Sequence, residues 1–241
     1  MNYVNFLLLY WIDSHWFIAL VMSACVNIGV YLCAAYLLSM VIRYSVNLHG
    51  LGEFINDEPL KNKQVKMELK NGVFACIIFA FGSLASRELF SSVWPGSGVD
   101  VILQVCSFII FYETYSYFIH RVLHFKVLAR FHGVHHKSVR VTPWSAYSVH
   151  PIEAFFIGVS APLFMLFFNL SLGFALTLHV FGMIFTILLH SNFQYVGNNV
   201  FLKLLFSYPK FHAKHHNEGD VNYGFFNKGW DSLFGTLSYK K

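Results

Sequence analysis

Long apolar runs, interrupted by polar loops, are the dominant pattern along the chain. A helix rises 1.5 Å per residue, so about 20 apolar residues cross the roughly 30 Å hydrocarbon core of a bilayer. Five runs approach or exceed that length: residues 16–42, 73–90, 99–119, 152–170 and 172–189. The pattern predicts an all-α fold, a multi-pass transmembrane helical bundle of four or five membrane helices. The very tight turn near Ser171 leaves open whether the last two runs cross completely or form a shorter hairpin.

The polar segments predict how the chain is threaded through the membrane. Residues 47–71, residues 120–150 and the C-terminal segment hold most of the lysines and arginines. Five crossings place all three segments on one side, and the positive-inside rule makes that side cytoplasmic. Residues 1–98 are therefore predicted to form N-terminal membrane helices and a polar loop. Residues 99–241 are predicted to form a catalytic domain with a cytoplasmic, helical, histidine-rich cap.

Composition supports a membrane protein and argues against nucleic-acid binding. The chain is 56% hydrophobic and 12% charged, whereas an average soluble domain is roughly 25% charged. The formal net charge of +5 is modest and scattered, so loop charges that orient membrane helices explain it better than a nucleic-acid partner does.

Histidines carry the candidate chemistry. Ten of the thirteen occur as an HxxxH pair, two HxxHH blocks and two single sites: His120, His124, His132, His135, His136, His150, His190, His212, His215 and His216. Residues at i, i+3 and i+4 share one face of a helix, so each cluster is predicted to project its rings together. Ten imidazoles are too many for one metal ion. They suit two ions with about five nitrogens each and an open coordination position on each ion, as oxygen-activating non-haem iron requires.

Carboxylates near these histidines are candidates for indirect support. Neutral nitrogen ligands leave the charge of a cation uncompensated, so acidic groups beside them are expected. Glu113 precedes His120 by two helical turns, Glu153 follows His150 by three residues, and Asp231 lies in the C-terminal segment. The remaining histidines are interpreted as ordinary surface residues, although the third could share a helix face with a ligand: His15, His49 and His179.

The order of the motifs HRVLH, FHGVHH, HPIE, HSN, HAKHH, NYG and WDSLFGT resembles the fatty acid hydroxylase/sterol desaturase superfamily over roughly residues 110–237. The resemblance implies an integral-membrane di-iron oxygenase whose histidine boxes correspond to the clusters above, with His150 and His190 as isolated ligands. Asn222 and Asp231 lie in the matching tail motifs and are expected beside the ligand shell. Some fatty acid 2-hydroxylases have HxxxH where this chain has Thr186 and His190. This departure favours the sterol-desaturase-like branch.

Together these features predict an enzyme that hydroxylates a C–H bond of a lipid or sterol-like substrate with O2, with no catalytic residue beyond the metal ligands. Desaturation by the same site is the alternative. A metal-binding membrane transporter is a distant alternative, because transport should place ionisable residues in mid-membrane.

Partners and location follow from the same prediction. The sequence contains no GxGxxG, haem-binding or cysteine-cluster motif, so electrons should come from a ferredoxin or a cytochrome b5-like carrier with its reductase. A basic face at Lys126, Arg130 and Lys137 is the predicted docking surface. The expected location is a bacterial inner membrane or the endoplasmic reticulum.

Overall fold

The computed structural model describes residues 3–238, without the side chains of residues 48 and 49. These residues are mostly helical, with two three-residue strands and two short 3-10 helices, η1 and η2. In chain order its elements are α1 (Tyr3–Asp13), α2 (Trp16–His49), β1 (Gly52–Phe54), α3 (Gln64–Leu89), α4 (Gly98–Leu123), α5 (Ala129–His132), η1 (His135–Lys137), η2 (Pro143–Tyr147), α6 (Pro151–Gly158), α7 (Ser160–Met165), α8 (Leu172–Leu189), β2 (Phe193–Tyr195), α9 (Val200–Leu205), α10 (Ser207–Glu218) and α11 (Gly229–Leu233).

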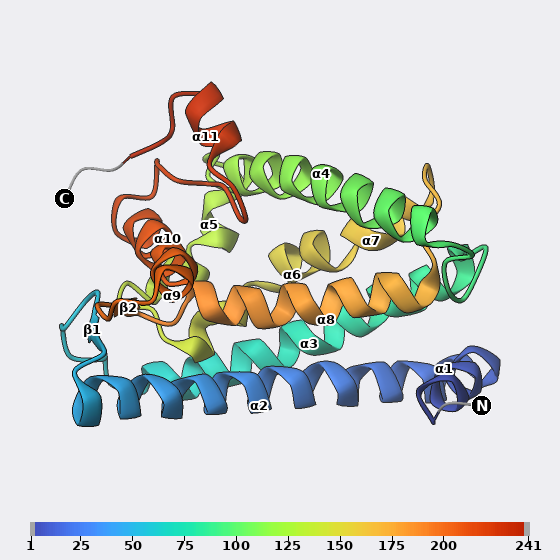
Figure 1. Ribbon diagram of the computed structural model, residues 1–241, viewed down its shortest axis with the longest axis horizontal. Coiled ribbons are helices and arrows are strands. Elements are labelled where there is room, and N and C mark those ends of the chain that lie inside the picture. The colour runs from blue at the N-terminus through green and yellow to red at the C-terminus, as the bar shows by residue number, and fades with distance from the viewer. Residues whose placement is uncertain (1–2, 239–241) are drawn as a thin grey trace.

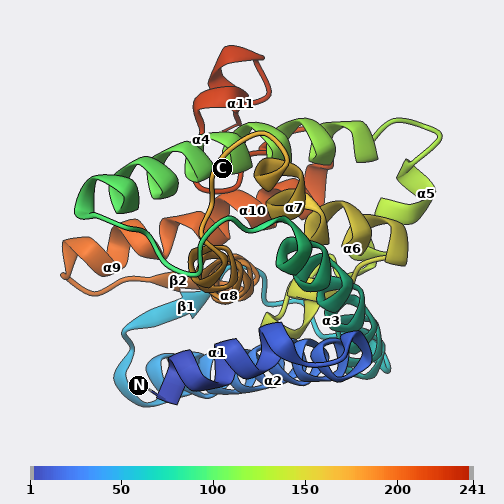
Figure 2. The ribbon, with the colours of Figure 1, turned by 90° about the vertical axis from the view of Figure 1, so that its right-hand side faces the viewer.

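Within the described residues, four helices are long and apolar enough to cross a bilayer: Trp16–Asn47, Gln64–Leu89, Gly98–Leu123 and Leu172–Leu189. They lie lengthwise along the molecule in Figure 1, with the short elements of the histidine-rich region gathered at one end and α1 at the other. Seen end-on, α8 lies between α2 and α4, with α3 and α6 to one side (Figure 2). The prediction of an all-α multi-pass bundle is confirmed.

The predicted run 152–170 is not one helix. It breaks into α6 and α7 around Val159. Pro162 accounts for the break, because a proline lacks the N–H of an intrahelical hydrogen bond and its ring clashes with the carbonyl four residues earlier, here that of Gly158. The segment nevertheless returns the chain to the far end of the bundle, where the amide of Leu172 donates to the Ser92 carbonyl at 3.0 Å.

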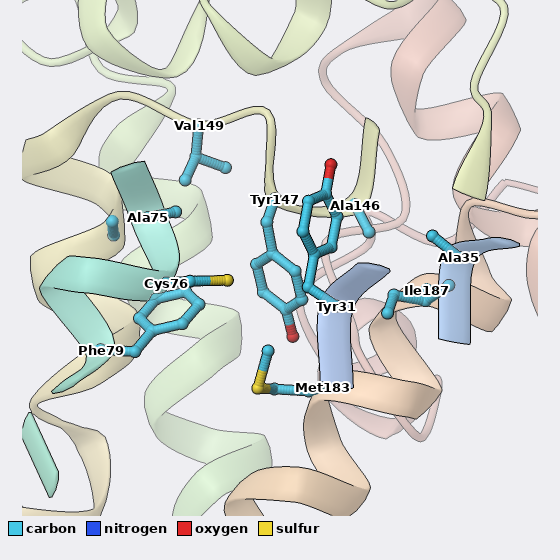
Figure 3. Close-up of a cluster of buried hydrophobic side chains, with 11 residues drawn as sticks. Tyr31, Ala35, Ala75, Cys76, Phe79, Ala146, Tyr147, Val149, Met183 and Ile187 are labelled. Carbon is cyan, nitrogen blue, oxygen red and sulfur yellow. The ribbon is translucent and has the colours of Figure 1, made fainter. Parts of the chain in front are cut away.

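An aromatic core joins the spans to the loop between η1 and α6. Tyr31 on α2 and Phe79 on α3 both pack edge-on against Tyr147, with ring centroids 6.1 and 5.1 Å away. Figure 3 shows the Tyr147 hydroxyl pointing toward Met183 of α8. The Tyr31 hydroxyl donates to the Trp144 carbonyl at 2.7 Å, so the loop is fixed by both packing and a buried hydrogen bond.

A buried carboxylate holds the same loop at residues nearer to η1. Glu68 on α3 is fully buried and accepts hydrogen bonds from Gln64, Ser138 and Thr142 at 2.7, 2.7 and 2.6 Å. A carboxylate removed from water is tolerated only when its oxygens are bonded in this way. Glu68 therefore holds the backbone that follows the first HxxHH block.

A small antiparallel sheet, which the sequence pattern did not predict, pairs the loop after α2 with the segment after α8. Gly52 lies opposite Tyr195, and Phe54 lies opposite Phe193. A side chain at Gly52 would come within 2.0 Å of the Phe193 ring, so glycine is required there. The pairing brings the predicted polar loop to the same end of the bundle as the histidines.

Candidate metal centre

Two of the spans deliver histidines at their ends. His120 lies in the last turn of α4, and His124 caps that helix. His190 caps α8, with its Nδ1 2.7 Å from the Thr186 carbonyl. These positions arise because each apolar run continues as a helix until the first polar residues beyond it.

The second and third clusters come from short elements that lie across the ends of the spans. His212, His215 and His216 project from α10, as the i, i+3, i+4 spacing predicted. The first HxxHH block is not one continuous helix, which corrects the prediction. His132 ends α5, whereas His135 and His136 belong to the separate 3-10 helix η1.

Nine of the ten predicted ligands converge in two neighbouring groups. Within each group the candidate ligand atoms all lie within 4.8 Å of one another. One group has five members: His120, His124, His132, His136 and His215. The other has four: His135, His190, His212 and His216. All nine of these residues are buried or half-buried, so the groups form two adjoining imidazole-lined sites inside the protein.

The outward ring nitrogens of several members are held by acceptors. The Nδ1 atoms of His120 and His215 lie 3.0 and 2.7 Å from the carbonyls of Tyr223 and Val221. Because a carbonyl can only accept, these Nδ1 atoms carry the proton and each Nε2 keeps its lone pair. Glu153 places a carboxyl oxygen 3.0 Å from Nδ1 of His132, a close contact without hydrogen-bond geometry. Such partners orient the ligands in metalloproteins.

The inward nitrogens fit a metal ion better than they fit each other. The Nε2 pairs His132–His136, His124–His215 and His190–His212 lie 3.1, 3.2 and 3.0 Å apart. Two nitrogens bound at about 2.1 Å and at right angles would lie about 3.0 Å apart. The buried Nε2 of His120 has no hydrogen-bond partner among the described residues. A metal ion in each group would satisfy these lone pairs.

Burial keeps the rings in the neutral form that binds metal. Removal from water lowers the pKa of His132, His136 and His190 to about 4, and of His124 to about 3. Neighbouring histidines lower the pKa of His124 and His136 further. All four rings are therefore neutral at pH 7, with one nitrogen protonated and the other free to bind a metal, which matches the ligand role of neutral imidazole.

Two cavities adjoin the histidines. A small one of about 110 Å³ is lined by members of both groups and by aromatic side chains. A larger one of about 490 Å³ lies among α4, α6, α7 and α8 and is lined mainly by apolar side chains. Tyr112, Tyr147 and Ile157 line both cavities, so the larger, apolar cavity lies directly beside the smaller one, which the candidate ligands line.

His150 lies outside both groups. Its Nδ1 accepts a hydrogen bond from the Ile152 amide at 3.2 Å, capping α6, and its ring packs against Phe131. Of the other histidines, His15 is exposed, and His179 lies 3.3 Å from Asn27 in the bundle. The side chain of His49 is outside the described residues.

The predicted supporting carboxylates have different environments. Glu153 contacts a candidate ligand directly, as described above. Glu113 contacts the C-terminal segment, accepting hydrogen bonds from the amides of Phe226 and Asn227 at 2.8 and 3.0 Å. It therefore joins α4 to the loop before α11.

Asp231 and Asn222 act on the loop that carries the Tyr223 carbonyl. Asp231 is fully buried and accepts from the amides of Tyr223 and Gly224 at 2.9 and 2.7 Å. Asn222 adopts a positive φ of 57°, and its side chain bonds the backbone of Phe211 and Ser238. The two residues thus fix the acceptor for His120 through the backbone.

No sequence pattern indicates the main-chain acceptors. The carbonyls of Thr186, Val221 and Tyr223 contact ligand rings, and any residue has such a carbonyl. Tyr223 could have been suspected only from its place between Asn222 and Gly224.

Fold and site together define a multi-pass membrane protein with two histidine groups that could hold metal ions. The model of the fatty acid hydroxylase family matches residues 105–236, which is more than half of the chain. The chain therefore belongs to the fatty acid hydroxylase family.

Similar curated proteins are sterol desaturases of fungi. The Delta(7)-sterol 5(6)-desaturase of Leptosphaeria maculans is 32% identical over 189 residues, which cover 74% of this chain and 51% of that protein. The Delta(7)-sterol 5(6)-desaturase of Eremothecium gossypii is 29% identical, with 73% and 52% covered. A probable Delta(7)-sterol 5(6)-desaturase of Neurospora crassa is 31% identical, with 73% and 53% covered. The chain spans about half the length of these relatives. No solved structure matches it significantly.

Proposed function

We propose that this protein is a membrane-bound di-iron oxidoreductase that uses O2 and external electrons to oxidise a C–H bond of a lipid or sterol-like substrate. One observation carries the proposal: nine imidazoles meet in two adjoining groups, each with its ligand atoms within 4.8 Å. Bound iron would supply the activation of O2 and the oxidising power that an unactivated C–H bond requires.

The chain itself provides the environment for this chemistry. Nine histidines would hold the two ions, and His150 is left out of the proposed ligand set. The four-membered group has one ligand fewer than the five-membered group. The ion bound by the four-membered group would therefore be the one with an open coordination position. Glu153 would orient His132, while Asp231 and Asn222 would position His120 through the Tyr223 backbone.

Hydroxylation and desaturation can share this site. Hydroxylation adds one oxygen to the substrate, and it is the outcome that the family description favours. Desaturation removes two hydrogens, and the names of the similar fungal proteins favour it. Metal transport is disfavoured, because the nine histidines lie at the ends of the spans and not along their middle.

We further propose that the end with the histidines faces the cytoplasm, in a bacterial inner membrane or the endoplasmic reticulum. Lys126, Arg130 and Lys137 are exposed at this end and suit an acidic ferredoxin or cytochrome b5-like donor. Charge reversal of all three should slow turnover with the physiological donor. If turnover with each candidate donor were unchanged, the proposal that these residues form the docking surface would be wrong.

The proposal is tested with the full chain reconstituted in lipid nanodiscs. Two irons per chain and iron-dependent consumption of O2 in the presence of lipid are expected. Mass spectrometry of the lipids then separates the two reactions by a gain of one oxygen or a loss of two hydrogens. Stable folded protein that binds no iron would overturn the proposal.

A further inference from the structure

His179 is an ionisable residue near the middle of a membrane span. It is the eighth residue of α8, whose 18 residues run from Leu172 to Leu189, and it lines the larger cavity. Ionisable residues within spans are costly, and they commonly mark a functional site. The metal-binding groups do not include this histidine.

Hydrogen bonds to Asn27 determine which tautomer His179 adopts. The Nδ2 of Asn27 donates to the Cys76 carbonyl at 3.3 Å, so its Oδ1 is the acceptor that faces Nε2 of His179. That Nε2 must then carry the ring proton, and Nδ1 is left with a lone pair. No hydrogen bond to this Nδ1 is recorded among residues 3–238.

The other polar side chains of the larger cavity are mostly hydroxyls whose protons are already bonded, so only their oxygens, which are weaker acceptors than a neutral imidazole nitrogen, remain open to a ligand. The hydroxyls of Ser160 and Thr177 donate to backbone carbonyls of their own helices at 2.8 and 2.6 Å. The Tyr147 hydroxyl bonds the side chain of Thr186. Tyr112 remains, at the boundary with the smaller cavity. The apolar cavity therefore offers one acceptor nitrogen away from the metal centre.

We infer that His179 is a specificity-determining residue that accepts a hydrogen bond from the hydroxyl group of a lipid alcohol held in this cavity. The inference rests on the proposed function, because it names the substrate class of that site. An acceptor nitrogen can bind an alcohol, which donates a proton, but not an ether or a ketone, which can only accept. A cavity of about 490 Å³ is within the size range of small-molecule sites.

The position of His179 also predicts where oxidation occurs. His179 and the candidate ligand His190 are eleven residues apart on α8, a rise of about 16 Å. The cavities that contain them share Tyr112, Tyr147 and Ile157. A lipid whose hydroxyl bonds His179 would therefore present a remote carbon to the metal centre, and not the carbon that bears the hydroxyl.

Competitive binding to the iron-loaded full chain in nanodiscs tests the inference. The probes are deuterated hexadecan-1-ol and its methyl ether, and each is normalised to its uptake by empty nanodiscs. We expect the wild type to prefer the alcohol by about tenfold, the effect of one hydrogen bond. Equal binding of the two probes by the wild type would overturn the inference without any variant.

Three variants assign the preference to a residue. His179→Leu should abolish it, whereas Thr177→Val should retain it, because the inference assigns the accepting atom to His179 and the Thr177 proton is already donated to the Gly173 carbonyl. Retention in His179→Leu, or loss in Tyr112→Phe alone, would overturn the inference. Iron content, measured in parallel, checks that each variant is folded.

These arms do not depend on turnover. If the protein preferred the alcohol but bound no iron, the proposed function would be contradicted, and the inference that His179 binds an alcohol would still hold. If a lipid were oxidised at the carbon beside its hydroxyl, the placement of the substrate would be contradicted, and the proposed oxidoreductase function would still hold.

Discussion

The two HxxHH blocks have the same spacing but different backbones. The second block lies on a regular helix, α10, whereas the first passes from the end of α5 into the 3-10 helix η1. Both divide their rings in the same way. The outer pair of each block, at i and i+4, enters one group, and the i+3 ring enters the other: His132 and His136 with His215, and His212 and His216 with His135.

This exchange explains why the spacing matters more than the helix. Gly133 and Val134, which separate α5 from η1, have φ/ψ values of −58°/−17° and −65°/−42°. These angles are right-handed and near helical, so the i and i+4 rings remain neighbours, with centroids 4.7 Å apart in the first block and 4.8 Å in the second. Each block contributes to both groups and thereby fixes one group against the other.

Removing the exchanged ring should have the largest effect. His135→Ala and His215→Ala each take one ligand from the group that the other block dominates. We expect lipid oxidation to fall by more than about 100-fold, because loss of a ligand should exceed the 10–100-fold effect of losing an outer partner. Product analysis by mass spectrometry and iron content measure the effect.

The exposed His15 gives the matched control, and His15→Ala should keep full iron and activity. If either His135→Ala or His215→Ala retained wild-type oxidation, that residue would not be a ligand, and the symmetrical division of the two blocks would be lost.

The two blocks also differ in how their rings are supported. His132 contacts the carboxylate of Glu153, whereas His215 contacts the main-chain carbonyl of Val221. Burial raises the pKa of Glu153 well above its usual range. Glu153→Gln replaces the carboxyl group but keeps an oxygen beside His132, so we expect iron affinity to fall by about tenfold, the lower end of the range for such partners. Competition with a chelator measures this affinity.

Glu113→Gln serves as the comparison for Glu153→Gln. Glu113 bonds the segment at Phe226 and Asn227 and no histidine. Its substitution should lower thermal stability with iron affinity unchanged. Equal iron affinities for wild type and Glu153→Gln would show that the His132 contact does not tune the metal.

Acid should destabilise the iron-free protein through both blocks. Burial lowers the pKa of His132 and His136 to about 4, and places the pKa of His212 and His216 well below the usual 6.5. Their neutral forms are favoured in the folded state, so this stability is present above pH 6.5 and is lost as the pH falls from 6.5 toward 4.

Thermal unfolding of chelator-treated protein between pH 8 and pH 4.5 checks this expectation. The melting temperature should be nearly constant above pH 7 and should fall below pH 6.5. The double variant H132N/H136N should show a shallower fall. A melting temperature independent of pH would mean that these histidines are not buried as neutral rings.

The lengths of the apolar runs predicted four of the spans, because each buried or lipid-facing helix needs a continuous run of suitable length. Histidine spacing predicted the nine converging rings. Neither pattern indicated the break at Val159, for which Pro162 inside the apolar run was the available sequence signal. The carbonyl acceptors of Val221 and Tyr223 could not be predicted from the sequence, because every residue has a backbone carbonyl.

His150 marks the limit of motif-based prediction, and its substitution should have the smallest effect. Its motif suggested a tenth ligand, but its Nδ1 accepts from the Ile152 amide and caps α6. His150→Ala should therefore lower the free energy of unfolding by about 1 kcal/mol, a typical loss for an N-cap, with iron content unchanged. His150→Asn should restore the stability, because asparagine is a preferred N-cap residue. Loss of iron in both variants would instead return His150 to the ligand set, and would require the loop before α6 to move when metal binds.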